Sequence, residues 1–149
     1  MATAADVAAY LVQKYGPMPQ VKLQKLLYYC QAWYIVWSRG EPLFPEAIEA
    51  WANGPVVPEV WRSNRYQYLV EQIDGGQAEA LDKRASEAVD AVMGAYGNLE
   101  PQALVELTHT EIPWKAARGD LSDGQRGSGV ISPQAMLDFY RRLLPDNAV

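Results

Sequence analysis

An apolar stretch at residues 20–38 constrains the fold of this chain more than any other feature of its sequence. One arc of a helix over this stretch collects seven apolar side chains: Leu23, Leu26, Leu27, Cys30, Trp33, Tyr34 and Trp37. From Tyr28 onward the opposite side is also apolar, because it carries Tyr28, Tyr29, Ile35 and Val36. A helix that is apolar nearly all round is buried on several sides. The sequence therefore predicts a central helix at about 20–38.

The most apolar part of this helix, residues 26–37, is too short to cross a lipid bilayer. It has twelve residues, flanked by Lys25 and Arg39, whereas a membrane span needs about 20. Residues 1–15 lack the basic start and the long apolar run of a signal peptide. We therefore expect a buried helix in a cytoplasmic protein.

The rest of the chain has helical periodicity interrupted by short loops. Amphipathic patterns predict further helices at about 3–15, 58–66 and 78–96, and after Pro101 and Pro133. The predicted fold class is mainly α: a single compact domain over residues 1–149, with about six helices around the central one. Extended segments at about 47–51 and 129–132 are compatible with at most a small two-stranded β-ribbon. With 149 residues, of which 49% are hydrophobic, the chain can bury a core without disulfides.

The composition excludes several classes of function. A single cysteine, Cys30, cannot form an internal disulfide, and with a single histidine, His109, the usual zinc ligand sets are excluded. The net charge of −5 is unfavourable for binding a phosphate backbone. No spacing matches a phosphate-binding loop or a dinucleotide fingerprint. We therefore predict neither a metal nor a cofactor.

Three residues are candidates for catalysis, and each has a simpler structural interpretation. Cys30 lies on the apolar arc of the central helix, where a free cysteine behaves as a small hydrophobic residue. His109 lies at the end of a helix without a supporting nucleophile or base at a suitable spacing. Ser128 lies between two glycines but lacks the full nucleophile-elbow pattern. No catalytic residue is predicted, and the chain is not expected to be an enzyme.

Charge is distributed unevenly along the chain. The first forty residues carry Lys14, Lys22, Lys25 and Arg39 against one acidic residue, Asp6, whereas residues 71–106 are strongly acidic. This asymmetry could orient a charged partner. A solvated face with local ion pairs is the simpler interpretation.

An aromatic segment at residues 51–68 is the strongest candidate for a partner-binding surface. The chain has five tryptophans and nine tyrosines, and both residue types are enriched at binding hot spots. The candidate binding residues are Trp51, Val56, Val57, Trp61, Tyr66 and Tyr68. The same segment could instead cover the central helix as part of the core, and the sequence leaves both interpretations open.

Two long blocks, residues 22–34 and 48–58, resemble the Panacea domain family, which contains SocA-like antitoxins and GepA-type phage-associated proteins. The stretches 107–114 and 131–140 are similar to later blocks of that family, so that the resemblance covers nearly the whole chain. Pro19, just before the first block, departs from the family pattern and leaves the exact helix start open. The residues that carry the motif, expected to be structural, are Lys22, Leu23, Lys25, Leu26, Leu27, Tyr28, Tyr29, Gly54, Pro55 and Trp114.

The resemblance implies an antitoxin, bacterial or phage-borne, that neutralises a toxin encoded beside it through direct protein–protein contact. It also implies an association with a AAA+ protease, to which the antitoxin delivers the toxin as an adaptor. Two alternatives from the residues themselves stay open. One is a small enzyme that uses His109 with Glu111 and Ser128, and the other is a nucleic-acid-binding regulator that uses Lys14, Lys22 and Lys25.

Overall fold

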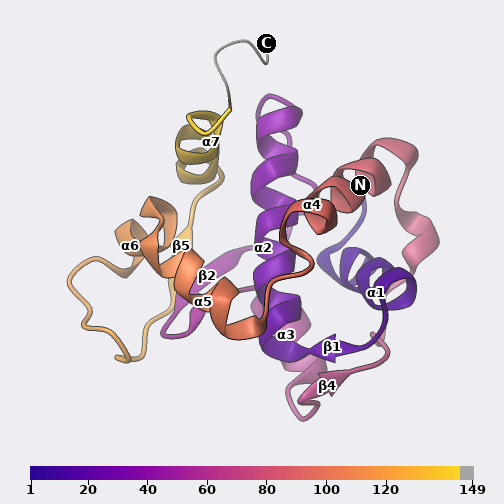
Figure 1. Ribbon diagram of the computed structural model, residues 1–149, viewed down its shortest axis with the longest axis horizontal. Helices are drawn as coiled ribbons and strands as arrows, with labels where there is room; N and C mark the ends of the chain where they lie inside the picture. Colours follow the sequence, from indigo (N-terminus) through magenta and orange to yellow (C-terminus); the bar gives the residue numbers. More distant parts are fainter. Residues whose placement is uncertain (145–149) are drawn as a thin grey trace.

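The structure is a computed structural model that describes residues 1–144, and it confirms a mainly helical fold (Figure 1). Within these residues it contains seven α-helices, one 3-10 helix and five short strands. The α-helices are α1 (Ala4–Tyr15), α2 (Gln20–Trp37), α3 (Pro58–Asn64), α4 (Lys83–Tyr96), α5 (Pro101–Thr110), α6 (Ile112–Arg118) and α7 (Pro133–Arg141). The strands are β1 (Met18–Pro19), β2 (Ile48–Trp51), β3 (Gly54–Val56), β4 (Leu69–Val70) and β5 (Gly129–Ile131).

Helix α2 is the centre of the fold, as the sequence predicts. It runs through the middle of the molecule, with α1 and α4 on one side and α5, α6 and α7 on the other (Figure 1). All residues from Leu23 to Ala32 are buried, so the helix is covered on every side over more than two turns. The predicted arc is wrong at its end, because Trp37 is exposed and Trp33 is only half-buried. No helix among residues 1–144 combines the length and the hydropathy needed to cross a bilayer.

Helix ends follow local chemistry that the sequence displays. Thr3 begins α1 with a reciprocal capping box, in which its hydroxyl accepts the Asp6 N–H and the Asp6 carboxylate accepts the Thr3 N–H. The predicted helix at 78–96 is divided in the structure. A 3-10 turn spans Ala78–Ala80, and α4 begins only after Asp82, because the Asp82 side chain accepts the Ala85 N–H and caps a new helix.

The β structure is larger than the two-stranded ribbon that the sequence predicts. Strands β2 and β5 pair antiparallel, with Ile48 opposite Ile131, and β3 adds a third strand on the other edge of β2. Pro55 is compatible with β3 because β3 is an edge strand, where a missing N–H does not break a ladder. A second small sheet pairs β1 with β4.

A buried hydrogen-bond network joins α2 to the start of α6 and to α7. The hydroxyls of Tyr29 and Tyr140 both donate to Oε1 of Glu111, at 2.6 and 2.8 Å. The Tyr28 hydroxyl lies 2.8 Å from that of Tyr140. Since the Tyr140 proton goes to Glu111, Tyr28 is the donor of this third bond. All four side chains are buried, so the network fixes how the C-terminal helices pack on α2.

Candidate functional site

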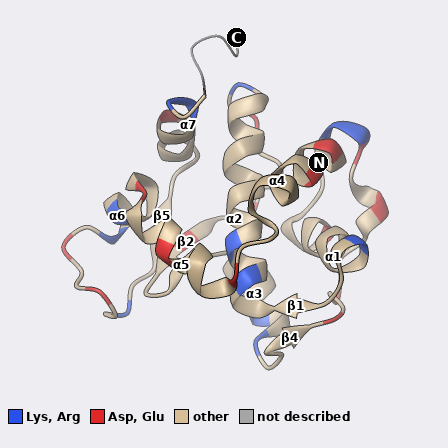
Figure 2. Cartoon of the chain, viewed as in Figure 1, with Lys and Arg blue, Asp and Glu red and all other residues tan. Residues whose placement is uncertain are grey.

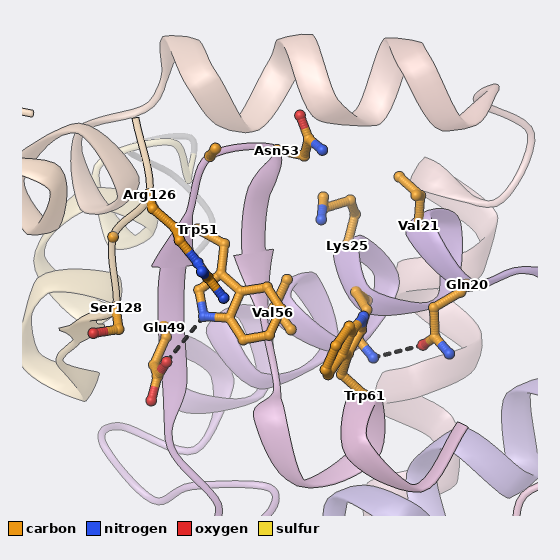
Figure 3. A pocket seen from close by; sticks show the side chains of 13 residues that line it. Gln20, Val21, Lys25, Glu49, Trp51, Asn53, Val56, Trp61, Arg126 and Ser128 are labelled. Carbon is orange, nitrogen blue, oxygen red and sulfur yellow. Dashed lines mark hydrogen bonds between the residues drawn. The ribbon is translucent and has the colours of Figure 1, made fainter. Parts of the chain in front are cut away.

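A cleft of about 710 Å³ opens beside the first two turns of α2. We call it the tryptophan cleft, and Figure 3 shows the side chains that line it. Its walls come from α2, the β2–β3 hairpin, α3 and the loop that leads into β5. The lining residues are Gln20, Val21, Gln24, Lys25, Glu49, Trp51, Ala52, Asn53, Val56, Trp61, Arg126, Gly127 and Ser128.

Two tryptophans form the aromatic wall of the cleft. The rings of Trp51 and Trp61 meet edge to face, with centroids 5.1 Å apart and an interplanar angle of 72°. Both are half-buried, so part of each ring faces the open cleft. The indole N–H of Trp51 donates to the Glu49 carboxylate at 2.9 Å, which holds the Trp51 ring in one orientation.

Two glutamines of α2 form the hydrogen bonds that connect the elements at the floor of the cleft. Gln24 Oε1 accepts the Val57 N–H at 2.8 Å, and its amide nitrogen donates to Gln20 Oε1 at 2.7 Å. Gln20 in turn donates to the Asn64 carbonyl at 3.0 Å. These bonds link α2 to the end of the hairpin and to α3, so the cleft is held by the fold itself.

Lys25 lies at the floor of the cleft and is only 1% exposed. Its Nζ donates to the Pro55 carbonyl at 3.1 Å, and no Asp or Glu among residues 1–144 pairs with it within 4.0 Å. Burial lowers the pKa of this amine to about 7. Gly54 packs directly on the lysine stem. A Cβ there would come within 2.7 Å of Lys25 Cε, and its φ of +112° also favours glycine.

The outer wall of the cleft is the loop 119–128. Arg118, which is buried, holds this loop by donating to the carbonyls of Ser122 and Gln125 at 2.9 and 2.6 Å. The loop thereby places Arg126 and Ser128 on the cleft. Within the described residues Arg126 has neither an ion pair nor a side-chain hydrogen bond.

The structure separates the residues of the predicted aromatic segment. Trp51, Val56 and Trp61 line the cleft. Val57 is completely buried beneath it and contributes only its backbone N–H to Gln24. Tyr66 and Tyr68 are 88% and 80% exposed and lie outside the cleft, after α3.

The family-motif residues divide into core and cleft residues. The buried core of α2 contains Leu23, Leu26, Leu27, Tyr28 and Tyr29. Trp114 donates its indole N–H to the Trp51 carbonyl at 2.8 Å, behind the hairpin that carries Gly54 and Pro55. Lys22 lies outside the cleft and donates to the Gly97 carbonyl at 2.7 Å. Lys25 is the motif residue on α2 that reaches the cleft.

Several lining residues were not assigned to a binding site from the sequence, and the polar ones among them are Gln20, Gln24, Glu49, Asn53, Arg126 and Ser128. The sequence does contain a feature that could have predicted the two glutamines, because polar side chains spaced by four residues on a mainly apolar helix indicate buried hydrogen bonds. Arg126 and Ser128 have no local signal. Pairing of β5 with β2 brings them to the cleft from the other end of the chain.

The structure does not assemble the alternative catalytic group. His109 stacks on Trp114, with ring centroids 3.9 Å apart, and burial lowers its pKa. Glu111 accepts from Tyr29 and Tyr140 instead, and no hydrogen bond within residues 1–144 links His109 to Glu111 or Ser128. Cys30 is buried, and burial raises the pKa of its thiol. The described residues also contain no cluster of three metal-ligating side chains.

The lysines of the nucleic-acid alternative do not form a common surface. Lys14 pairs with Asp90 at 2.8 Å, Lys22 binds Gly97, and Lys25 is buried. On α2, basic positions are confined to its N-terminal half (Figure 2). A phosphate backbone requires an accessible basic stripe, and these three lysines do not provide one.

Comparison with known proteins matches a family model to the part of the chain that forms the inner half of the cleft. The family described as "Antitoxin SocA-like, Panacea domain" matches residues 23–115. Antitoxin SocA of Caulobacter vibrioides (strain NA1000 / CB15N) is 29% identical over 111 residues, which is 66% of this chain. The chain spans 58% of the length of that relative. No solved structure gives a significant match. Lys25, Trp51 and Trp61 lie inside the matched region, whereas Arg126 and Ser128 lie beyond it.

Proposed function

The chain belongs to the SocA-like antitoxin, Panacea domain family, and from this premise we propose that it neutralises a toxin by direct protein–protein contact. In this proposal residues 1–149 act as one domain, and a segment of the toxin occupies the tryptophan cleft. The toxin is expected to be the protein encoded beside it. The adaptor role toward a AAA+ protease stays a prediction, and the half-life of the toxin with that protease, with and without this protein, tests it.

The observation that carries this proposal is the pair of half-buried tryptophans on a concave, preformed site. Binding sites are usually concave, mostly apolar and provided with a few fixed polar groups, and tryptophan is enriched among residues that dominate binding energy. Trp51 and Trp61 face a cleft of about 710 Å³ whose floor is fixed by Gln20 and Gln24. A protein segment can therefore bury both rings without reorganising the fold.

Trp61→Ala is expected to weaken toxin binding by about 2 kcal/mol, the usual size of a hot spot, or roughly thirty-fold in Kd. The melting temperature of the free protein should change little, because the ring lies on the cleft rather than in the core. Titration calorimetry and thermal unfolding on the same variant measure both quantities.

Tyr66→Ala is the matched control for this experiment. Tyr66 follows α3 closely but is exposed and outside the cleft, so its truncation should leave affinity unchanged. Normal affinity in Trp61→Ala, or a larger loss in Tyr66→Ala, would move the binding surface from the cleft to the exposed tyrosines.

The proposal assigns no catalytic step to His109. His109→Phe keeps a ring to stack on Trp114 and removes both nitrogens, so toxin binding and protection of cells should persist. Growth in cells that express the toxin, together with the Kd of the complex, measures this. A folded variant that binds the toxin normally but fails to protect cells would indicate an enzymatic role.

A further inference from the structure

The tryptophan cleft is lined by two basic side chains, neither of which forms an ion pair with an Asp or Glu of residues 1–144. Lys25 lies at its floor and Arg126 on its outer wall (Figure 3). The chain as a whole has a net charge of −5, so carboxylates are abundant elsewhere on the molecule. One acidic residue, Glu49, also lines the cleft, where it accepts the indole N–H of Trp51. The cleft lining thus has two basic side chains and one acidic one, the reverse of the balance in the chain as a whole.

Lys25 differs from Gln20 and Gln24, its neighbours at the floor of the cleft, in that fewer of its hydrogen-bonding groups are used within the fold. Gln24 uses both its oxygen and its nitrogen within the fold, and Gln20 accepts from one partner and donates to another. Lys25 donates only to the Pro55 carbonyl, although an amine head group carries further donor capacity. A buried amine with unused capacity costs stability that methionine at the same place would not. Packing alone does not explain a lysine here.

We propose that the tryptophan cleft binds a carboxylate: an Asp or Glu side chain in an apolar segment of the partner protein, paired with Lys25 and Arg126. The apolar neighbours of that carboxylate lie against Trp51 and Trp61. This inference rests on the proposed function, since it names the chemistry by which the toxin is held. Charge complementarity selects the occupant, and the aromatic wall supplies contact area.

Carboxylate binding at Lys25 is linked to proton uptake. In the free protein the pKa of Lys25 is about 7, and a bound carboxylate favours the charged form. Above pH 7 the affinity therefore falls by up to tenfold per pH unit. The other charged groups that line the cleft are Glu49 of β2 and Arg126 of the outer loop. His109 of α5 senses the charge of Lys25 as well as those of Asp123 in the outer loop and Arg118 of α6. The pKa of His109 is lowered from 6.5, so this side chain stays neutral over the range tested.

A small aromatic acid tests the site without the toxin. Phenylacetate is titrated against phenylacetamide, its uncharged counterpart, while the indole N–H resonances of Trp51 and Trp61 are followed by NMR. The acid should bind at least tenfold more tightly than the amide, and Lys25→Met should abolish this preference. Lys22→Met, the same change on the same helix but outside the cleft, should keep it. Equal binding of acid and amide, no binding of either, or an undiminished preference in Lys25→Met would overturn the proposal.

The toxin itself provides the second arm of the test. Lys25→Met, shown by thermal unfolding to be folded, should bind the toxin at least tenfold more weakly at pH 7. Its affinity should also lose the decline that the unchanged protein shows between pH 7 and pH 9. If Trp61→Ala weakens toxin binding but Lys25→Met does not, the carboxylate proposal fails and the antitoxin proposal stands. If phenylacetate binds as expected but the toxin does not bind, the antitoxin proposal fails instead.

Discussion

Lys25→Met is expected to raise the free energy of unfolding at pH 7 by about 3 kcal/mol. The lowering of the Lys25 pKa from 10.5 to about 7 means that the folded state disfavours the ammonium by roughly 4–5 kcal/mol. Methionine fills similar volume without a charge. The gain is reduced because the Pro55 carbonyl loses its donor, which costs about 1–2 kcal/mol. Urea unfolding of the two proteins measures the difference.

The pH dependence of the stability difference between Lys25→Met and the original protein reveals its cause. Removal of a buried charge gives a difference that changes with pH, whereas better packing gives a constant one. Between pH 7 and pH 10.5 the unfolded chain binds more protons at residue 25 than the folded one does. The free energy by which Lys25 destabilises the fold therefore becomes smaller as the pH rises. Below pH 7 the destabilisation is fully present. The advantage of Lys25→Met should therefore shrink by about 2 kcal/mol between pH 7 and pH 9. Lys22→Met, which loses the bond to Gly97 at a half-buried position, should not be stabilised. A Lys25→Met protein less stable than the original at pH 7 would contradict this account.

Glu111→Ala should have the opposite effect, a loss of about 4 kcal/mol. The change removes the acceptor of two buried hydroxyls, those of Tyr29 and Tyr140. Each buried donor left without a partner costs about 1–3 kcal/mol. Both hydroxyls donate to the same oxygen, Oε1, so a single amide oxygen can replace it. Glu111→Gln should therefore retain most of the stability in the same urea titration, and an equal loss in both variants would show that the carboxylate charge is required.

The charge of Glu111 has its own pH signature. Burial raises the pKa of this carboxyl above 4.5, although the hydrogen bonds from Tyr29 and Tyr140 act in the opposite direction. The folded state therefore holds the proton more tightly than the unfolded chain. The contribution of Glu111 to the free energy of unfolding is therefore present in full at low pH. It is lost as the pH rises from 4.5 through the raised pKa. Glu111→Gln should lack this decline.

Local signals in the sequence predicted the helical frame well. The doubly apolar pattern of residues 20–38 identified α2 as central, and the amphipathic pattern at about 3–15 identified α1. The third strand, β3, was not predicted, because Gly54 and Pro55 are typical of turns and only an edge position makes them compatible with a strand. Its existence depends on pairing with β2, which no local pattern displays.

The candidate site could be predicted only in part. The tryptophans at 51 and 61 were predicted by their chemistry, but a cluster of aromatic residues does not reveal which of them face a cleft. The burial of Lys25 was not predicted, because lysine is rarely fully buried. Its burial follows from the packing of Gly54 on its stem, a contact between residues far apart in sequence.

The way in which the loop 119–128 is held bears on which of its residues can change without affecting the fold. The inner half of the cleft belongs to α2 and the hairpin, so changes there also act on folding. Arg118 holds the loop through its backbone, by bonds to two carbonyls, whereas Arg126 and Ser128 line the cleft. Carbonyl groups are the same whatever residue carries them. If the cleft binds the toxin as we propose, mutations at these positions are expected to alter partner choice while the core stays unchanged.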